Sequence, residues 1–84
     1  MSKKDKLVKR FLSRPKDFIW QELIVMLAGF GYAQQTAGKT SGSRVRFSHK
    51  SLPPIILHKP HPAKILKRYQ IDQIIELLKN EGLL

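Results

Sequence analysis

The sequence predicts a small α+β domain in which two helices cover one face of a three-stranded antiparallel sheet. Residues 20–30 and 71–78 repeat apolar side chains at the three- and four-residue spacing of an amphipathic helix. Between these segments lie three short strand-like runs separated by turn residues. With 84 residues, the chain is expected to form one domain around one core.

The N-terminal residues 3–12 form a basic amphipathic stretch. Its apolar side chains lie at helical spacing with Lys and Arg between them: Leu7, Val8, Phe11 and Leu12. Two interpretations stay open, a short helix docked on the core and a helix lying on a membrane surface. The short length and the absence of an interfacial Trp favour the docked helix. We treat residues 1–15 as a basic extension and residues 16–84 as the folded domain.

The first core helix has clear boundary signals. Pro15 and Asp17 indicate a break and a helix start, and Gly29 and Gly31 indicate its end. The buried stripe of this helix is predicted to consist of Trp20, Leu23, Ile24, Leu27 and Phe30. Lys79 and Gly82 are the corresponding stop signals of the last helix, whose stripe comprises Ile71, Ile74, Ile75, Leu77 and Leu78.

Three strands are predicted between the helices, over residues 32–37, 44–47 and 55–58. Residues 37–43 are rich in small turn residues, and two prolines exclude regular structure from residues 59–62. In the second strand, alternation directs Val45 and Phe47 to the core. Arg44 and Arg46 therefore share the solvent face of the sheet.

The charge balance is strongly basic, with 16 Lys and Arg against six Asp and Glu and a formal net charge of +10. No carboxylate occurs between Glu22 and Asp72. A folded surface built from that span must be positive, which favours a polyanionic ligand whose phosphates release counterions on binding. The alternative is that the charge only keeps a small protein soluble. The cations of the span are Lys39, Arg44, Arg46, Lys50, Lys59, Lys64, Lys67 and Arg68.

Several classes of protein and site are disfavoured by composition. The absence of Cys excludes a disulfide scaffold, a thiolate nucleophile and a Cys zinc site, and it fits a cytoplasmic location. The longest apolar run, residues 23–30, is too short to span a bilayer, and the N-terminus lacks a signal-peptide core. Gly38-Lys39-Thr40 lacks the upstream Gly of a phosphate-binding P-loop, so we expect no cofactor.

Two histidines, His58 and His61, lie three residues apart and flank Lys59-Pro60. A metal site needs a third ligand, and His49 is the only other His, so we expect no metal. His titrates near neutral pH, which suits a general acid or base. Cleavage of RNA by its own 2′-hydroxyl needs such groups together with cations for the phosphate. The alternative is that both histidines are ordinary loop residues.

Two loop motifs, placed on this order of elements, give the chain a family resemblance. The Gly42-Ser43-Arg44 turn and the Lys59-Pro60-His61-Pro62 loop resemble those of the HicA family of toxin–antitoxin ribonucleases. That family has a Gly-Ser-His turn before the second strand, a loop with Pro and His after the third, and a last helix ending like Leu77-Leu78-Lys79-Asn80-Glu81-Gly82-Leu83. The resemblance covers residues 20–84.

The resemblance implies a fold like a double-stranded-RNA-binding domain, messenger or structured RNA as ligand, and a HicB-like antitoxin as partner. It also implies that Arg44 occupies the position of the family's catalytic His. Arg keeps its proton and cannot act as a general base, although it can clamp a phosphate. If the chain cleaves RNA, His61 or His58 must transfer the proton and Arg44 must act as an electrostatic helper. The alternative is a binding module without chemistry.

The expected RNA contacts combine the second strand, the two loops and the approach to the last helix. They comprise Lys39, Ser43, Arg44, Arg46, Lys59, Lys64, Lys67 and Arg68. Residues 64–68 precede a helix whose N-terminus itself attracts phosphate. We expect no membrane association of this domain.

Overall fold

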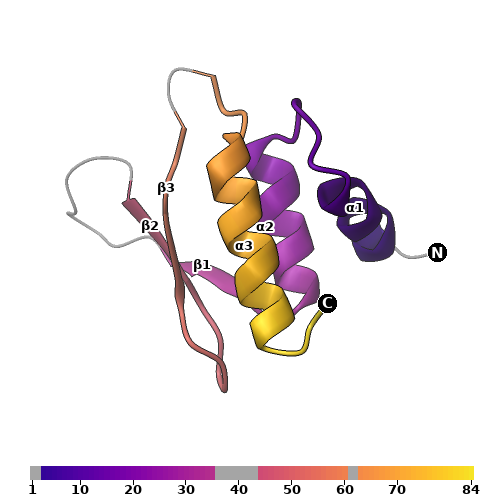
Figure 1. The fold of residues 1–84 in the computed structure, drawn as a ribbon. Coiled ribbons are helices and arrows are strands. Elements are labelled where there is room, and N and C mark those ends of the chain that lie inside the picture. Colours follow the sequence, from indigo (N-terminus) through magenta and orange to yellow (C-terminus); the bar gives the residue numbers. More distant parts are fainter. Residues whose placement is uncertain (1–2, 36–43, 61–62) are drawn as a thin grey trace.

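Three strands form one antiparallel sheet, and two helices cover one of its faces (Figure 1). The computed structural model describes residues 3–35, 44–60 and 63–84. The helices are α1 (Lys3–Leu12), α2 (Trp20–Gly29) and α3 (Arg68–Asn80). The strands are β1 (Ala33–Gln35), β2 (Arg44–Ser48) and β3 (Ile55–His58). The predicted α+β class is confirmed.

The sheet has the order β1-β2-β3, with both neighbouring pairs antiparallel. Phe47 of β2 is fully buried against the helices, whereas Arg44 and Arg46 are exposed on the opposite face. β3 alternates in the same way, with Ile55 and Leu57 buried. The predicted alternation of β2 is therefore correct, because a strand directs successive side chains to opposite faces.

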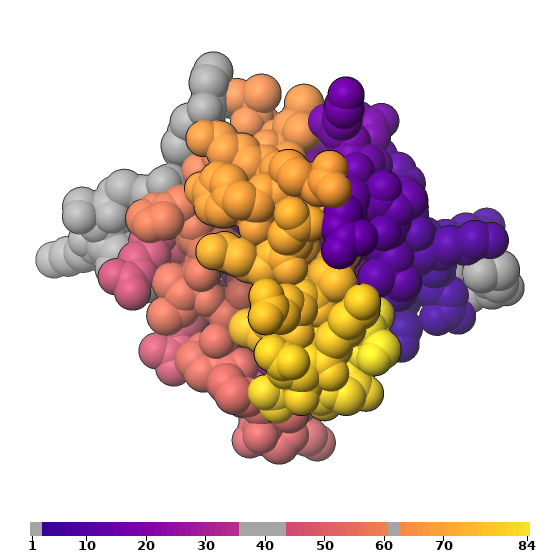
Figure 2. Space-filling view, viewed as in Figure 1, coloured from indigo at the N-terminus to yellow at the C-terminus, as the bar shows by residue number. Residues whose placement is uncertain are grey.

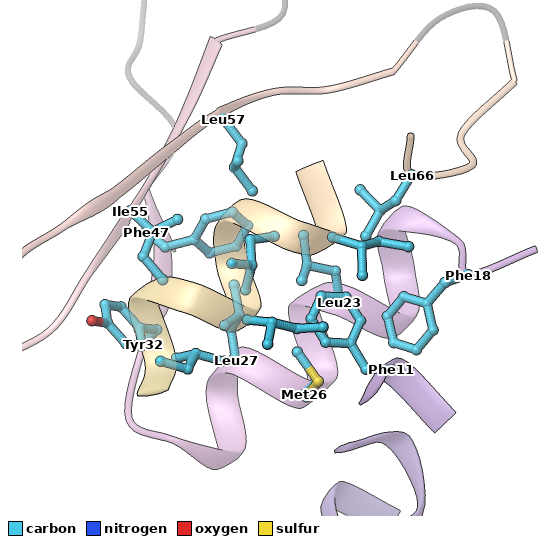
Figure 3. Packing of buried hydrophobic residues seen from close by; sticks show 14 of the residues in the cluster. Phe11, Phe18, Leu23, Met26, Leu27, Tyr32, Phe47, Ile55, Leu57 and Leu66 are labelled. Carbon is cyan, nitrogen blue, oxygen red and sulfur yellow. The ribbon is translucent and has the colours of Figure 1, made fainter. Parts of the chain in front are cut away.

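The core lies between the sheet and the pair α2 and α3, and α1 adds to it from the side (Figure 3). The rings of Trp20 and Phe47 lie 5.7 Å apart and join α2 to the sheet. Aromatic pairs at this separation contribute beyond their buried area. The largest fully buried side chains are Phe11, Phe18, Leu23, Met26, Leu27, Phe47, Ile71, Ile74, Ile75 and Leu78.

The helix α2 begins at Trp20, later than Pro15 and Asp17 suggest. Phe18, just before it, is fully buried and has its backbone carbonyl occupied outside the helix. The Oε1 atom of Glu22 accepts a hydrogen bond of 3.0 Å from the Ile19 N–H, which caps the helix at that residue. Tertiary pairing of residues 18–20 therefore displaces the helix start.

That pairing is a short antiparallel bridge between the segments that precede α2 and α3. The Trp20 N–H donates to the Lys64 carbonyl and the Leu66 N–H donates to the Phe18 carbonyl, each over 2.8 Å. Ile19 and Ile65 face each other in the bridge. The two backbone bonds hold the N-terminal ends of α2 and α3 side by side, as Figure 1 shows.

The helix α1 packs on α2 with its apolar stripe turned inward. Phe11 is fully buried and meets Phe18 edge to face, with ring centroids 4.9 Å apart. Arg10 donates to Asp17 over 2.8 Å and to Glu22 over 2.7 Å. These contacts agree with the docked interpretation of the N-terminal stretch. Within residues 3–35, 44–60 and 63–84, no helix is long and apolar enough to cross a membrane.

Asp72 ties the loop after α1 to α3, because it accepts from Arg14 over 2.7 Å and from Arg68 over 3.4 Å. The hydrogen bond from Arg14 is the main reason that the pKa of Asp72 lies below its usual 3.8. A carboxyl group with a lowered pKa adds stability above its usual pKa and loses that contribution as the pH falls through the lowered value.

We therefore predict that Asp72→Asn lowers the thermal unfolding temperature at neutral pH. The difference from wild type should begin to shrink below about pH 3.8 and should close as the pH falls through the lowered pKa, where the carboxyl group becomes protonated in both states. Thermal unfolding followed by circular dichroism measures this from about pH 7, where aspartate carboxyl groups are ionised, down to about pH 2. Glu76→Gln, an exposed change on the same helix, is the control. A difference between Asp72→Asn and wild type that stays constant over the whole range would contradict the assignment.

Candidate functional site

The exposed face of the sheet brings together two residues that are distant in the sequence. Arg44 opens β2, His58 ends β3, and the two residues are direct partners across the antiparallel pair. Direct partners in such a pair have Cβ atoms about 4.5–5.5 Å apart and point to the same side. Both side chains are exposed. An imidazole and a guanidinium therefore share one end of the sheet, on the face away from the helices.

Arg46 extends this face by one further row. It pairs with Gln35 of β1 and with Ile56 of β3, and all three side chains are exposed. The row places a second guanidinium two residues from the first on the same strand and face. A polyanion lying on the open face of the sheet can thus meet Arg44 and Arg46 together.

The end of β3 is fastened to the start of α3 by Gln70, whose side chain is only 3% exposed. Its Nε2 donates to the His58 carbonyl over 2.8 Å, and its Oε1 accepts from the Lys67 N–H over 3.0 Å. The buried amide of Gln70 thus links the backbone of His58, at the end of β3, to the backbone of Lys67, just before α3. The cations at the start of α3 are therefore held beside the end of the sheet.

Sequence reasoning missed Gln70 as part of the site. A signal for it exists, because Gln three residues after a helix cap commonly reaches back to the backbone N–H of the cap residue. The second bond, to His58, depends on how β3 and α3 meet and has no local signal. Gln70 is a positioning residue, because its hydrogen bonds fix other groups of the site.

We use the name cationic surface for the basic residues that these contacts group around His58. Its described members are Arg44, Arg46, Lys59, Lys64, Lys67 and Arg68. Lys59 is half-buried, and the others are exposed. No carboxylate lies in the sequence between Glu22 and Asp72, so residues 44–60 and 63–68, which supply this surface, carry only positive charges.

Carboxylates near this surface are engaged by structural arginines. Asp17 and Glu22 both accept from Arg10, and Asp72 is shared by Arg14 and Arg68. Arg68 keeps 69% of its side chain exposed in spite of the longer 3.4 Å contact with Asp72, so it stays accessible to a ligand. The acids therefore stabilise the helices and leave most of the cationic surface uncompensated.

Three of the sequence-predicted site residues lie outside the described residues. Lys39 and Ser43 fall in residues 36–43, and His61 falls in residues 61–62. The described chain resumes at Arg44 on one side and stops at Pro60 on the other. The roles assigned to these three residues remain predictions.

The imidazole of His49 makes hydrogen bonds that stabilise the fold, whereas the imidazole of His58 is exposed. Its Nδ1 accepts backbone N–H bonds from Ser51 and Leu52 over 3.0 and 3.2 Å, and its Nε2 lies 3.1 Å from the Phe30 carbonyl. Gly31, with φ of +95°, lies against it, since a Cβ there would come within 2.8 Å of Nε2. His49 is thus occupied in holding the β2–β3 turn. Among the residues that the structure describes, no group of three or more His, Asp or Glu could hold a metal ion.

The arrangement can perform two kinds of work. The arginines and lysines can bind phosphate groups, and Arg44 can stabilise charge that develops on a phosphate oxygen. His58, exposed beside Arg44, can give or take a proton. The family model described as "HicA toxin of bacterial toxin-antitoxin" matches residues 20–82, which contain the whole cationic surface and exclude α1. Neither a curated protein nor a solved structure matches the chain.

We predict that Gln70→Ala destabilises the fold by about 1–3 kcal/mol, because the His58 carbonyl and the Lys67 N–H then lose their partner. Urea unfolding of the variant and wild type measures the change. Gln73→Ala, on the exposed side of the same helix, is the matched control and should stay within about 0.5 kcal/mol of wild type. Equal stability of the two variants would show that the Gln70 bridge contributes nothing.

Proposed function

This chain belongs to the HicA toxin family of bacterial toxin–antitoxin systems, and we propose on that basis that it binds RNA and cleaves messenger RNA without a metal ion. Family membership implies an antitoxin partner, and we propose a HicB-like protein of a type II system in that role. The single observation that supports the RNA proposal most is the exposed Arg44–His58 pair, which lies in a span of sequence without carboxylates.

Cleavage in this proposal uses the RNA's own nucleophile. A histidine removes the proton of a 2′-hydroxyl, the 2′-oxygen bonds to the adjacent phosphorus, and the bond to the 5′-oxygen breaks as that oxygen receives a proton from a protonated histidine or from water. The products are a 2′,3′-cyclic phosphate and a 5′-hydroxyl. His58 or His61 acts as proton carrier, and Arg44 stabilises the charge on the phosphate in the transition state.

Binding in this proposal depends on phosphate contacts. The proposed contacts are Lys39, Ser43, Arg44, Arg46, Lys59, Lys64, Lys67 and Arg68. Each cation that neutralises a phosphate makes the affinity more sensitive to salt. The backbone N–H groups at the start of α3 add a favourable dipole beside Lys67 and Arg68.

A second candidate function is an RNA-binding or antitoxin-binding module that has lost its chemistry. Arg44 favours it, because the resemblance of the Gly42-Ser43-Arg44 turn implies that Arg44 stands where the family has its catalytic His, and Arg cannot act as a base. The two candidates share the ligand and differ only in whether a proton carrier has been retained elsewhere.

The test is cleavage of a labelled messenger RNA by purified protein in EDTA, with His58→Ala, His61→Ala and Arg44→Ala beside the wild type. We predict that cleavage persists in EDTA and falls by roughly 10²–10⁴-fold in at least one histidine variant. Gln35→Ala, on the same sheet face, is the control that should keep full activity. Cleavage that stops in EDTA, or that survives in both histidine variants, would refute the proposed mechanism. Salt-sensitive binding without cleavage would favour the second candidate.

A further inference from the structure

One aromatic side chain is used by neither the core nor the proposed chemistry. Of the seven aromatic residues of the chain, six are buried or half-buried, whereas Tyr69 is 55% exposed. Within the described part of the chain, the structure records no hydrogen bond or ring contact for Tyr69. By contrast, Tyr32 donates to the Pro53 carbonyl and packs on His49. More than half of the Tyr69 surface is therefore available to a ligand.

Tyr69 is the second residue of α3, and the helical repeat directs it away from the buried stripe of that helix. Lys64, Lys67 and Arg68 precede it within five residues, and all three are exposed. Figure 2 shows this first turn of α3 open on the surface, next to the segment that leads into it. The exposed ring thus lies in the chain directly beside half of the cationic surface.

Two further apolar side chains are exposed at this end of the molecule. Ile19 and Ile65 are partners in the bridge before α2 and α3, and they are 42% and 39% exposed. A single exposed apolar residue needs no explanation. Here, however, Ile65 and Tyr69 alternate in the sequence with Lys64, Lys67 and Arg68, so exposed apolar and basic side chains occur together at the start of α3.

We propose that Tyr69 stacks on an unpaired base of the bound RNA, so that the ligand is single-stranded at this site. This inference depends on the proposed RNA binding. Proteins that bind single strands combine cations along the backbone with an exposed aromatic ring on which a base stacks. In a duplex the base faces are already stacked and proteins contact mainly the backbone and groove shape, so a duplex would leave the ring unused.

A protein ligand is the competing explanation, because exposed tyrosines are also frequent in protein interfaces. The charge near Tyr69 favours RNA. The three neighbouring cations have one carboxylate close in sequence, Asp72, and this carboxylate is bonded to Arg14 and Arg68. The experiment below distinguishes RNA binding at Tyr69 from docking of the antitoxin there.

The experiment compares two labelled RNAs by fluorescence anisotropy, a single strand of about 12 nucleotides and a duplex of about 16 base pairs. Tyr69→Ala should weaken single-strand binding roughly 5- to 100-fold, and Tyr69→Phe should restore it, since the ring is retained. Duplex affinity should not change. The salt dependence should also stay constant, because stacking neutralises no phosphate. Asn80→Ala, exposed at the far end of α3, is the control.

The outcomes are distinguishable from those of the proposed function. If wild type binds neither RNA, the proposed function and this inference fail together. If wild type binds RNA and Tyr69→Ala binds both probes with the wild-type affinity, only the inference fails. Loss of antitoxin binding by that variant would then assign Tyr69 to the protein interface. An equal loss of affinity for the single strand and the duplex would also overturn the inference. Thermal unfolding of Tyr69→Ala shows that the variant used in this comparison is folded.

Discussion

Two backbone hydrogen bonds between residues 18–20 and 64–66 hold the N-terminal ends of α2 and α3 together, and the placement of the proposed RNA-binding surface depends on them. They fix the path of the chain after it leaves β3. Gln70 then joins the His58 carbonyl to the start of α3 from inside the core. Side chains from a strand, a connecting segment and a helix thereby share one end of the molecule. Buried hydrogen bonds of this kind are costly to leave unpaired, which keeps the arrangement specific.

The distribution of charge separates stability from binding. Arg10 and Arg14 take the carboxylates of Asp17, Glu22 and Asp72, and these ion pairs fasten α1 and the loop after it to the other helices. The lysines of the cationic surface and the two sheet arginines lie in the span between Glu22 and Asp72, which contains no carboxylate. The six cations of the cationic surface therefore stay available for a polyanion that can compensate their charge.

Local patterns predicted the elements well and their junctions poorly. β3 has the bounds expected from residues 55–58, and the alternation of Arg44 and Arg46 with Val45 and Phe47 assigned both faces of β2 correctly. The start of α2 was misjudged, because the bridge to residues 64–66 is a tertiary contact. The pairing of Arg44 with His58 and the second bond of Gln70 depend on strand register and on how β3 meets α3. No spacing within the sequence encodes either contact.

The most direct test asks whether RNA binding depends on where the charge lies. Two triple variants each lower the net charge from +10 by three. The first combines Lys64→Gln, Lys67→Gln and Arg68→Gln at the start of α3. The second combines Lys3→Gln, Lys6→Gln and Lys9→Gln in α1. The account predicts that the first variant loses affinity for a single-stranded RNA and that its salt slope falls by about two. The α1 variant should bind like wild type. Equal losses in both variants would mean that net charge alone attracts RNA, and would contradict the assignment of the cationic surface.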